Sequence, residues 1–370
     1  MLKPILYYQY IKNDLRQQPF AKYHFYIFCF LISVAVTAPF IAKQPTMTQF
    51  LPPLIPYDAM TTHLSDKLLS PFDNQPHLSW YRRHWLGTDG MGRDIAAGLV
   101  AGTRIALQVG LSSVALAAVI GLFAGLMSGY YGDERFRMPR RCVILWILGW
   151  TIWGFYIHVF AQQEWAFTQF YTTALIFTML LISVLHILEK MIMNIKHQAL
   201  IWIVPIDYLV MRSIDFLQAI PFLIILLGLM PFIKQKSVSN VILIIGCVTW
   251  MPIARLIRAQ VIRLRTRVFI QNAEALGYPT WRIWAFHLIP NLLTPLLVAM
   301  SFGVANAIMA EGLLSFLGVG LPDDLVTWGS ICQAARANAT HWWLVLFPSG
   351  AILLTVLIFN WLGEHLKQLK

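Results

Sequence analysis

The sequence predicts an all-α, polytopic membrane protein with about eight transmembrane helices. Of its 370 residues, 58% are hydrophobic and only 12% are charged, which is about half the charged share of a soluble domain. So few charges cannot cover a soluble surface of this size, which excludes an ordinary soluble enzyme, a disordered regulator and a fibrous repeat. The four cysteines are scattered without a C-x-x-C pair, so we expect neither a disulfide framework nor a zinc site.

Eight apolar segments are long enough to cross the hydrocarbon core, which takes roughly 20 residues of helix. They are residues 23–42, 105–127, 142–160, 170–188, 214–233, 238–254, 291–317 and 343–363. Residues 1–22 precede the first span, and the remaining spans fall within 105–365. Two regions are predicted to lie outside the membrane: a long loop over 43–104, rich in proline at its start, and a basic segment over 255–290 with a helical pattern of its own.

The distribution of Lys and Arg predicts the orientation. With the N-terminus inside, the inside segments hold 19 Lys and Arg residues and the three short outside loops hold three, while six lie in the loop 43–104. Basic residues are enriched in cytoplasmic loops, so we expect both termini and the segment 255–290 in the cytoplasm and the loop 43–104 outside. The same rule accounts for the net charge of +11 without nucleic-acid binding.

Motifs for enzymatic chemistry are absent from the sequence. It contains no GxxxxGK[ST] phosphate loop, no HExxH zinc motif and no GxSxG nucleophile elbow, so we expect no catalytic residue, cofactor or metal ligand. Glu311 is the one acid well inside a strong apolar span, whereas a proton-coupled carrier usually has several buried ionisable groups in series. These absences weaken the alternatives of an intramembrane enzyme and a secondary carrier but do not exclude them.

Residues 269–291 predict a helix–turn–helix at the membrane surface. The first helix ends at Gly277, where we expect the left-handed backbone that glycine adopts at helix C-termini, and the second begins near Thr280, with Pro279 close to its first turn. Exposed aromatic and apolar side chains on such a segment fit two interpretations. One is an amphipathic loop on the lipid headgroups, and the other is a docking site for another protein.

This segment resembles the cytoplasmic signature of the permease subunits of ATP-binding-cassette importers: Glu-Ala-Ala, three residues, Gly, nine residues, then hydrophobic-x-hydrophobic-Pro. Here Gln271-Asn272-Ala273 takes the place of Glu-Ala-Ala, Gly277 is the glycine, and His287-Leu288-Ile289-Pro290 closes the motif. Further motifs resemble the dipeptide/oligopeptide branch in the same order along the chain: HWLGTD at 84–89, GRD at 92–94, GTR at 102–104, RSID at 212–215, IP at 220–221, EGLLSFLG at 311–318, WG at 328–329 and NWLGE at 360–364.

The resemblance implies the type I importer permease fold and a bacterial inner-membrane location. It implies a second homologous permease, two cytoplasmic ATPase subunits, an external solute-binding protein, and a peptide or related solute as cargo. The chain is most similar to the C-type permease, the partner with the long external loop after its first span. The ATPase-coupling residues implied are Gln271, Asn272, Ala273, Gly277, His287, Ile289 and Pro290.

Two departures from the family pattern stand out. Gln271 replaces the usual Glu, so an ion pair with the ATPase is lost there although a hydrogen bond remains available. The pair of spans within 142–188 has no counterpart among the six core helices, and its aromatic side chains predict a lipid-facing inserted hairpin.

Four charged residues are candidates for polar contacts near the solute entrance or a subunit interface: Asp89, Arg93, Asp94 and Glu311. A structural cap or salt bridge in the external loop is the other interpretation of Asp89 and Arg93, and the residues favour it slightly. Arg255, Arg258 and Arg263 suit lipid headgroups better than ATPase contacts.

Two other classes of function stay open at this point: a self-contained channel or secondary carrier, and a scaffold that transports nothing. The residues do not name the cargo either, because dipeptides, longer oligopeptides and nickel chelates all use permeases of this type.

Overall fold

The computed structural model describes residues 19–42, 55–72, 75, 78–162, 167–193, 201–230 and 236–368. Most of the predicted N-terminal segment 1–22 and residues 43–54 of the predicted loop lie outside this description. The chain forms two compact units, one of residues 1–126 with 214–370 and one of residues 127–213. Each unit is described by itself.

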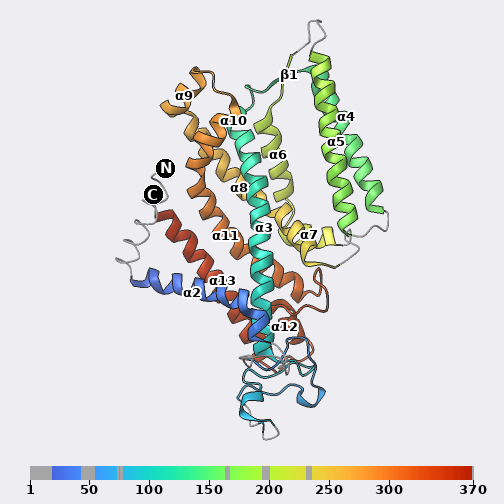
Figure 1. Ribbon diagram of the computed structural model, residues 1–370, viewed down its shortest axis with the longest axis vertical. Coiled ribbons are helices and arrows are strands. Elements are labelled where there is room, and N and C mark those ends of the chain that lie inside the picture. The colour runs from blue at the N-terminus through green and yellow to red at the C-terminus, as the bar shows by residue number, and fades with distance from the viewer. Residues whose placement is uncertain are drawn as a thin grey trace. The chain divides into compact units, whose positions relative to one another are not determined.

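The first unit is a helical bundle (Figure 1). Its α-helices are α2 (Pro19–Ile41), α3 (Ile95–Tyr131), α6 (Ile206–Gln218), α7 (Phe222–Leu229), α8 (Val238–Arg265), α9 (Val268–Ala275), α10 (Thr280–Ile283), α11 (Ile289–Phe316), α12 (Trp328–Ala334) and α13 (Trp343–Gln368). The last residues of α3 and the first residues of α6 belong to the second unit. Within the bundle α11 packs against α8, α12 and α13, and α9 and α12 lie at opposite ends.

Among the described residues, four helices are long and apolar enough to span a membrane: α3, α8, α13 and a continuous helix, Thr280–Phe316, that joins α10 to α11. Helices α6 and α7 make a fifth span if they are counted together, although they are bent by 87° where they meet. The all-α membrane fold is confirmed, and the count of eight spans stays a prediction.

Several helices extend beyond the apolar segments that predict them. α3 begins at Ile95 rather than near residue 105, α8 continues to Arg265, and the helix that includes α11 begins at Thr280. Hydropathy marks only the part of a helix that hydrocarbon can surround, whereas the backbone hydrogen bonds continue into water. Much of the segment 255–290 therefore consists of the ends of two long helices.

Two glycines bring α3 and α8 into close contact. A Cβ atom added at Gly121 would lie 2.8 Å from the Cβ of Ile253 and from the carbonyl oxygen of Trp250. One added at Gly125 would lie 2.7 Å from the carbonyl oxygen of Ala254. Small residues spaced four apart let two membrane helices approach to backbone contact, so any larger side chain at either position would push α8 away from α3.

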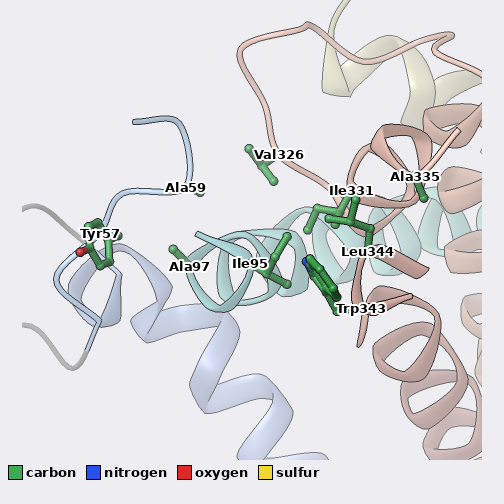
Figure 2. Close-up of a cluster of buried hydrophobic side chains, with 9 residues drawn as sticks. All are labelled: Tyr57, Ala59, Ile95, Ala97, Val326, Ile331, Ala335, Trp343 and Leu344. Carbon is green, nitrogen blue, oxygen red and sulfur yellow. The ribbon is translucent and has the colours of Figure 1, made fainter. Parts of the chain in front are cut away.

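The described part of the loop 43–104 packs as an ordered cap at the α12 end of the bundle. A buried cluster joins this loop to the starts of α3 and α13 and to α12 (Figure 2). Its members are Tyr57, Ala59, Ile95, Ala97, Val326, Ile331, Ala335, Trp343 and Leu344. The Nε1–H group of Trp343 donates to the carbonyl oxygen of Thr88 at 3.1 Å, and that of Trp328 donates to Leu99 at 3.0 Å. The cap is therefore fixed by apolar burial and by indole hydrogen bonds.

The second unit contains a helical hairpin and a short β-ribbon. Helices α4 (Arg140–Gln162) and α5 (Phe167–Met193) lie side by side (Figure 1), and the indole of Trp153 donates to the Thr178 hydroxyl at 2.8 Å. Strands β1 (Arg137–Pro139) and β2 (Ile201–Ile203) pair antiparallel. The predicted insertion 142–188 thus falls inside a compact unit separate from the main bundle.

Trp343 is expected to control the stability of the cap. Trp343→Phe removes the donor to the buried Thr88 carbonyl and should cost roughly 1–3 kcal/mol, whereas Trp343→Ala also leaves a cavity and should cost about 3–5 kcal/mol. Thermal unfolding of the purified protein in detergent measures both losses. The neighbouring Trp342 is 54% exposed, so Trp342→Phe is the control and should leave the melting temperature unchanged. If the wild-type protein and all of these variants melt at the same temperature, Trp343 does not stabilise the cap.

Candidate functional site

The helix–turn–helix at residues 268–288 is built around a left-handed glycine. Helix α9 ends with Leu276, and Gly277 follows with φ of +71°. The N–H of Gly277 donates to Glu274 at 3.0 Å and the N–H of Tyr278 donates to Ala273 at 3.1 Å. This pair of bonds is the Schellman motif, which satisfies the last carbonyls of a helix. The left-handed backbone expected at Gly277 is therefore present.

The second helix of the motif does not end at Pro290 but continues into the membrane-spanning part of α11. Pro279 is the N-cap of α10, and a π-helical turn, η4 (Trp284–Leu288), directly precedes α11. Pro290 stands at the start of α11. Because proline removes an N–H and its ring clashes with the carbonyl four residues earlier, a widened turn just before Pro290 relieves that clash. A movement of this motif is thus transmitted directly to α11.

Aromatic contacts hold the turn against the second helix. The Arg282 guanidinium lies over the Tyr278 ring at 4.4 Å from its centroid, and the rings of Tyr278 and His287 are stacked at 6.4 Å. His287 therefore acts within the motif, where it positions the turn.

The predicted coupling residues divide into an exposed set and a supporting set. Gln271, Asn272, Gly277 and Pro290 are exposed, Ala273 is buried, and His287 and Ile289 are half-buried. Two apolar side chains that the motif did not single out are more prominent, because Leu276 is 71% exposed and Trp281 is 65% exposed. We call the exposed set Gln271, Asn272, Leu276, Gly277 and Trp281 the α9–α10 surface. The sequence signal for Leu276 and Trp281 was that both are large apolar residues beside a turn.

A cavity of about 730 Å³ opens in the first unit between α3, α6, α7, α8 and α11. Its walls are mostly apolar, and its polar side chains are Gln218, Thr249 and Asn306. The break between α6 and α7 lies on the wall, since residues 220–222 line the cavity. Irregular backbone is tolerated at membrane depth where it is buried in protein or lines a water-filled cavity. The site thus combines an apolar wall with a break in the helix at one point.

Three of the predicted entrance residues hold the cap together. Asp89 accepts hydrogen bonds from the backbone N–H groups of Met91 and Arg93, and its other oxygen pairs with Arg93 Nε at 2.7 Å. Asp94 caps α3 by accepting from the N–H of Ala97 at 2.7 Å and also lies 2.8 Å from Nδ1 of the buried His84. These geometries match the cap and salt-bridge interpretation, and none of the three side chains lines the cavity.

The ring of Tyr57 is stacked on His84, with centroids 4.1 Å apart. Burial raises the pKa of the Tyr57 hydroxyl to about 12, and the nearby carboxylates of Asp94 and Asp66 add to the shift. The tyrosine therefore stays neutral and donates a hydrogen bond to the carbonyl of Arg82.

Glu311 lies apart from these residues, within α11. It is 1% exposed and accepts a hydrogen bond from the Ser315 hydroxyl at 2.7 Å. It does not line the cavity, so the four charged candidates do not form one site. Within the part of the chain that the structure describes, no group of three or more His, Cys, Asp or Glu residues is placed to hold a metal ion.

Long apolar helices around a cavity, with a helix–turn–helix protruding at one end, define a membrane transport permease. Residues 204–369 match the family of binding-protein-dependent transport system inner membrane components. A Brucella suis protein whose name assigns it to the peptide permeases is 30% identical over 78% of this chain and 72% of its own length. The oligopeptide transport system permease OppC of Bacillus subtilis is 26% identical, covering 87% and 79%. The glutathione transport system permease GsiD of Pectobacterium atrosepticum is 27% identical, covering 85% and 78%.

The chain belongs to this family of inner membrane components. It is a permease subunit of an importer of the ATP-binding-cassette type and not an enzyme. The fold-class expectation from the sequence motifs is confirmed, while the roles of individual site residues stay predictions.

Substitution of Gly277 tests the α9–α10 surface. No atom lies within 4 Å of a Cβ added there, so the Cβ of Gly277→Trp has room, and the substitution should cost about 1 kcal/mol for the left-handed backbone. The folded subunit should persist, whereas ATPase co-purification and uptake should be lost because the side chain occupies the docking surface. The matched control is Gly132→Trp, since Gly132 also has positive φ (+61°) and open space around it. Retained ATPase association in the Gly277 variant would contradict docking at this surface.

Proposed function

We propose that the chain forms one half of the translocation pathway for peptides or chemically similar solutes, and that a homologous second permease forms the other half. The observation that carries this proposal is the open cavity bounded by the broken helix α6–α7, by α8 and by α11. One subunit supplies one wall, and a second wall would enclose the solute. The naming of relatives as peptide, oligopeptide and glutathione permeases supports peptide-like cargo.

The chemistry of the wall suits a solute with a polar backbone and varied side chains. Peptide groups are costly to bury without hydrogen bonds, and Gln218, Thr249, Asn306 and the helix break offer a few polar positions. The remaining wall is apolar and lacks charged side chains. Such a wall discriminates little between side chains, so selectivity would lie mainly in an external solute-binding protein that delivers the cargo.

Two cytoplasmic ATPase subunits would dock on the α9–α10 surface of this chain and on its equivalent in the second permease. Leu276 and Trp281 are large apolar side chains at a turn, which suits insertion into a pocket of a protein partner. Gln271 can accept or donate hydrogen bonds to that partner without an ion pair. The lipid-headgroup interpretation is the alternative, and the Gly277 variants separate the two.

The distribution of basic residues supports the orientation of this assembly. Both termini and the α9–α10 surface would be cytoplasmic, which places α12 and the cap on the outer side. Asp89, Arg93 and Asp94 would keep the cap rigid at the solute entrance, and buried Glu311 would support α12 beneath it. The hairpin α4–α5 would contact lipid, because several of its aromatic and aliphatic side chains are exposed.

Reconstitution tests the proposed function directly. The chain is co-expressed with the second permease, the ATPases and the binding protein encoded beside it, and the complex is placed in liposomes. Uptake of a labelled peptide mixture should require every subunit together with ATP. Gradient-driven uptake by the purified chain alone would instead support a self-contained carrier.

The cavity makes a specific prediction for Asn306. Asn306→Trp fills the space between α11 and the broken helix, so uptake should fall to background while complex assembly and ATP hydrolysis remain. Leu297 is also exposed on α11 but does not line the cavity, so Leu297→Trp is the matched control and should retain uptake. If both variants transport equally well, the cavity is not the pathway.

A further inference from the structure

One ion pair joins the broken helix to α8 at the edge of the cavity. Arg255 Nη2 on α8 lies 2.5 Å from Asp215 Oδ1 on α6. Leu256, which follows Arg255, lines the cavity, and so does Gln218, which lies about one helical turn beyond Asp215. The pair is therefore the charged boundary between the apolar cavity and the α9 end of the bundle.

Helix α8 links this ion pair to the α9–α10 surface. It runs without interruption from Arg255 to Arg265, about 15 Å at the usual rise per residue. Only Thr266 and Arg267 separate it from α9, and backbone hydrogen bonds from Arg267 to Leu264 and from Ile270 to Arg267, both 3.0 Å, fix this connection. A displacement of α9 thus moves the α8 segment that carries Arg255.

Besides packing against α11 and α7, α8 borders α3 and α6, and these last two helices hold it with different firmness. Toward α3, Ala254 and Ile257 are completely buried and sit directly against Gly125. Toward α6, the Arg255 and Asp215 side chains are 45% and 50% exposed, and Phe216 beside Asp215 is 72% exposed. An ion pair with this much solvent contact is weak, so it can break and re-form, whereas the glycine contact with α3 must persist.

We propose that the Asp215–Arg255 ion pair is a latch that couples the α9–α10 surface to the opening of the cavity. When the ion pair is formed, it holds α6 against α8 and shuts the α9 end of the cavity. When bound ATPases displace α9, α8 carries Arg255 away from Asp215, and the segment α6–α7 is released at its break. The inference rests on the proposed function and adds the residues that regulate it.

The chemistry of the pair explains why both charges are needed together. Removing one member abolishes the attraction between α6 and α8 and leaves the other charge without its partner, while each side chain keeps about half of its solvent contact. Exchanging the two charges restores the attraction, because Coulomb energy depends on their product and not on which helix carries which sign. The latch therefore predicts that reversing either charge alone uncouples ATP hydrolysis from transport. Exchanging both charges should restore the coupling.

Charge exchange in the reconstituted transporter tests the latch. Asp215→Arg and Arg255→Asp should each lower the number of solutes transported per ATP hydrolysed by about tenfold, within the usual range of coupling between sites, while ATP hydrolysis continues. The double variant should recover most of the wild-type ratio. A merely structural role would lower hydrolysis and transport together and would not alter their ratio.

A second ion pair at the other end of α8 supplies the matched control. Lys236 Nζ lies 2.9 Å from Asp323 Oδ1, with side chains 48% and 91% exposed. Reversal of Lys236 or Asp323 should leave the transport ratio unchanged. If a reversal at residue 215 or 255 prevents accumulation of the subunit, Asp215→Asn and Arg255→Gln replace it and should show the same loss of coupling.

The outcomes separate this inference from the proposed function. Wild-type complex that shows no ATP-dependent uptake contradicts the proposed function itself. If the wild-type complex takes up solute and the single variants transport the same number of solutes per ATP hydrolysed, the latch is wrong and the proposed function stands. Failure of the double variant to recover, while it assembles normally, also overturns the latch, because the two charges would then act separately.

Discussion

The close contact of α3 with α8 is the constraint on which the rest of the bundle depends. An added Cβ atom would lie 2.8 Å from an α8 carbonyl oxygen at Gly121 and 2.7 Å from one at Gly125, so the two helices pack at backbone contact and any larger side chain would separate them. About three turns earlier on the same side, α3 also packs closely against α11, since a Cβ added at Gly110 would lie 2.8 Å from the Ile308 side chain. Three long helices thus form a rigid core that needs no polar contact to hold it.

Function follows from what this core leaves free. One face of α8 is committed to α3, and an adjacent face borders the cavity beside the break where α6 and α7 meet at 87°. Beside the cavity the broken helix meets α8 through apolar side chains and the Asp215–Arg255 ion pair, and its first turn is held to α3 by a hydrogen bond from the Ser128 hydroxyl to Asp207. A permease driven by separate ATPase subunits needs one element that transmits their movement and one element that changes position in response. In this chain α8 transmits the movement, and the segment α6–α7 changes position.

The sequence predicts the all-α fold, the helix–turn–helix and the left-handed Gly277, because hydropathy and glycine–proline turns act locally. It does not predict the break within the span 214–233, although Pro221 disfavours helix at the residue before it; composition alone reads the segment as one span. The pairing of Asp215 with Arg255, 40 positions apart, depends on packing, as does the cap that buries Asp89 and Asp94. Exposure of Leu276 and Trp281 likewise follows from the turn that Gly277 makes.

The central claim is that α8 moves as one body with α3 and against α6. Pulsed electron paramagnetic resonance can measure the distances between these helices with spin labels at exposed positions: Ile262 on α8, Val119 on α3 and Phe216 on α6. In the assembled transporter, adding ATP should change the distance between labels at 262 and 216 and leave the distance between 262 and 119 unchanged. A constant distance between 262 and 216 in a complex that transports, or a change between 262 and 119, would contradict the account.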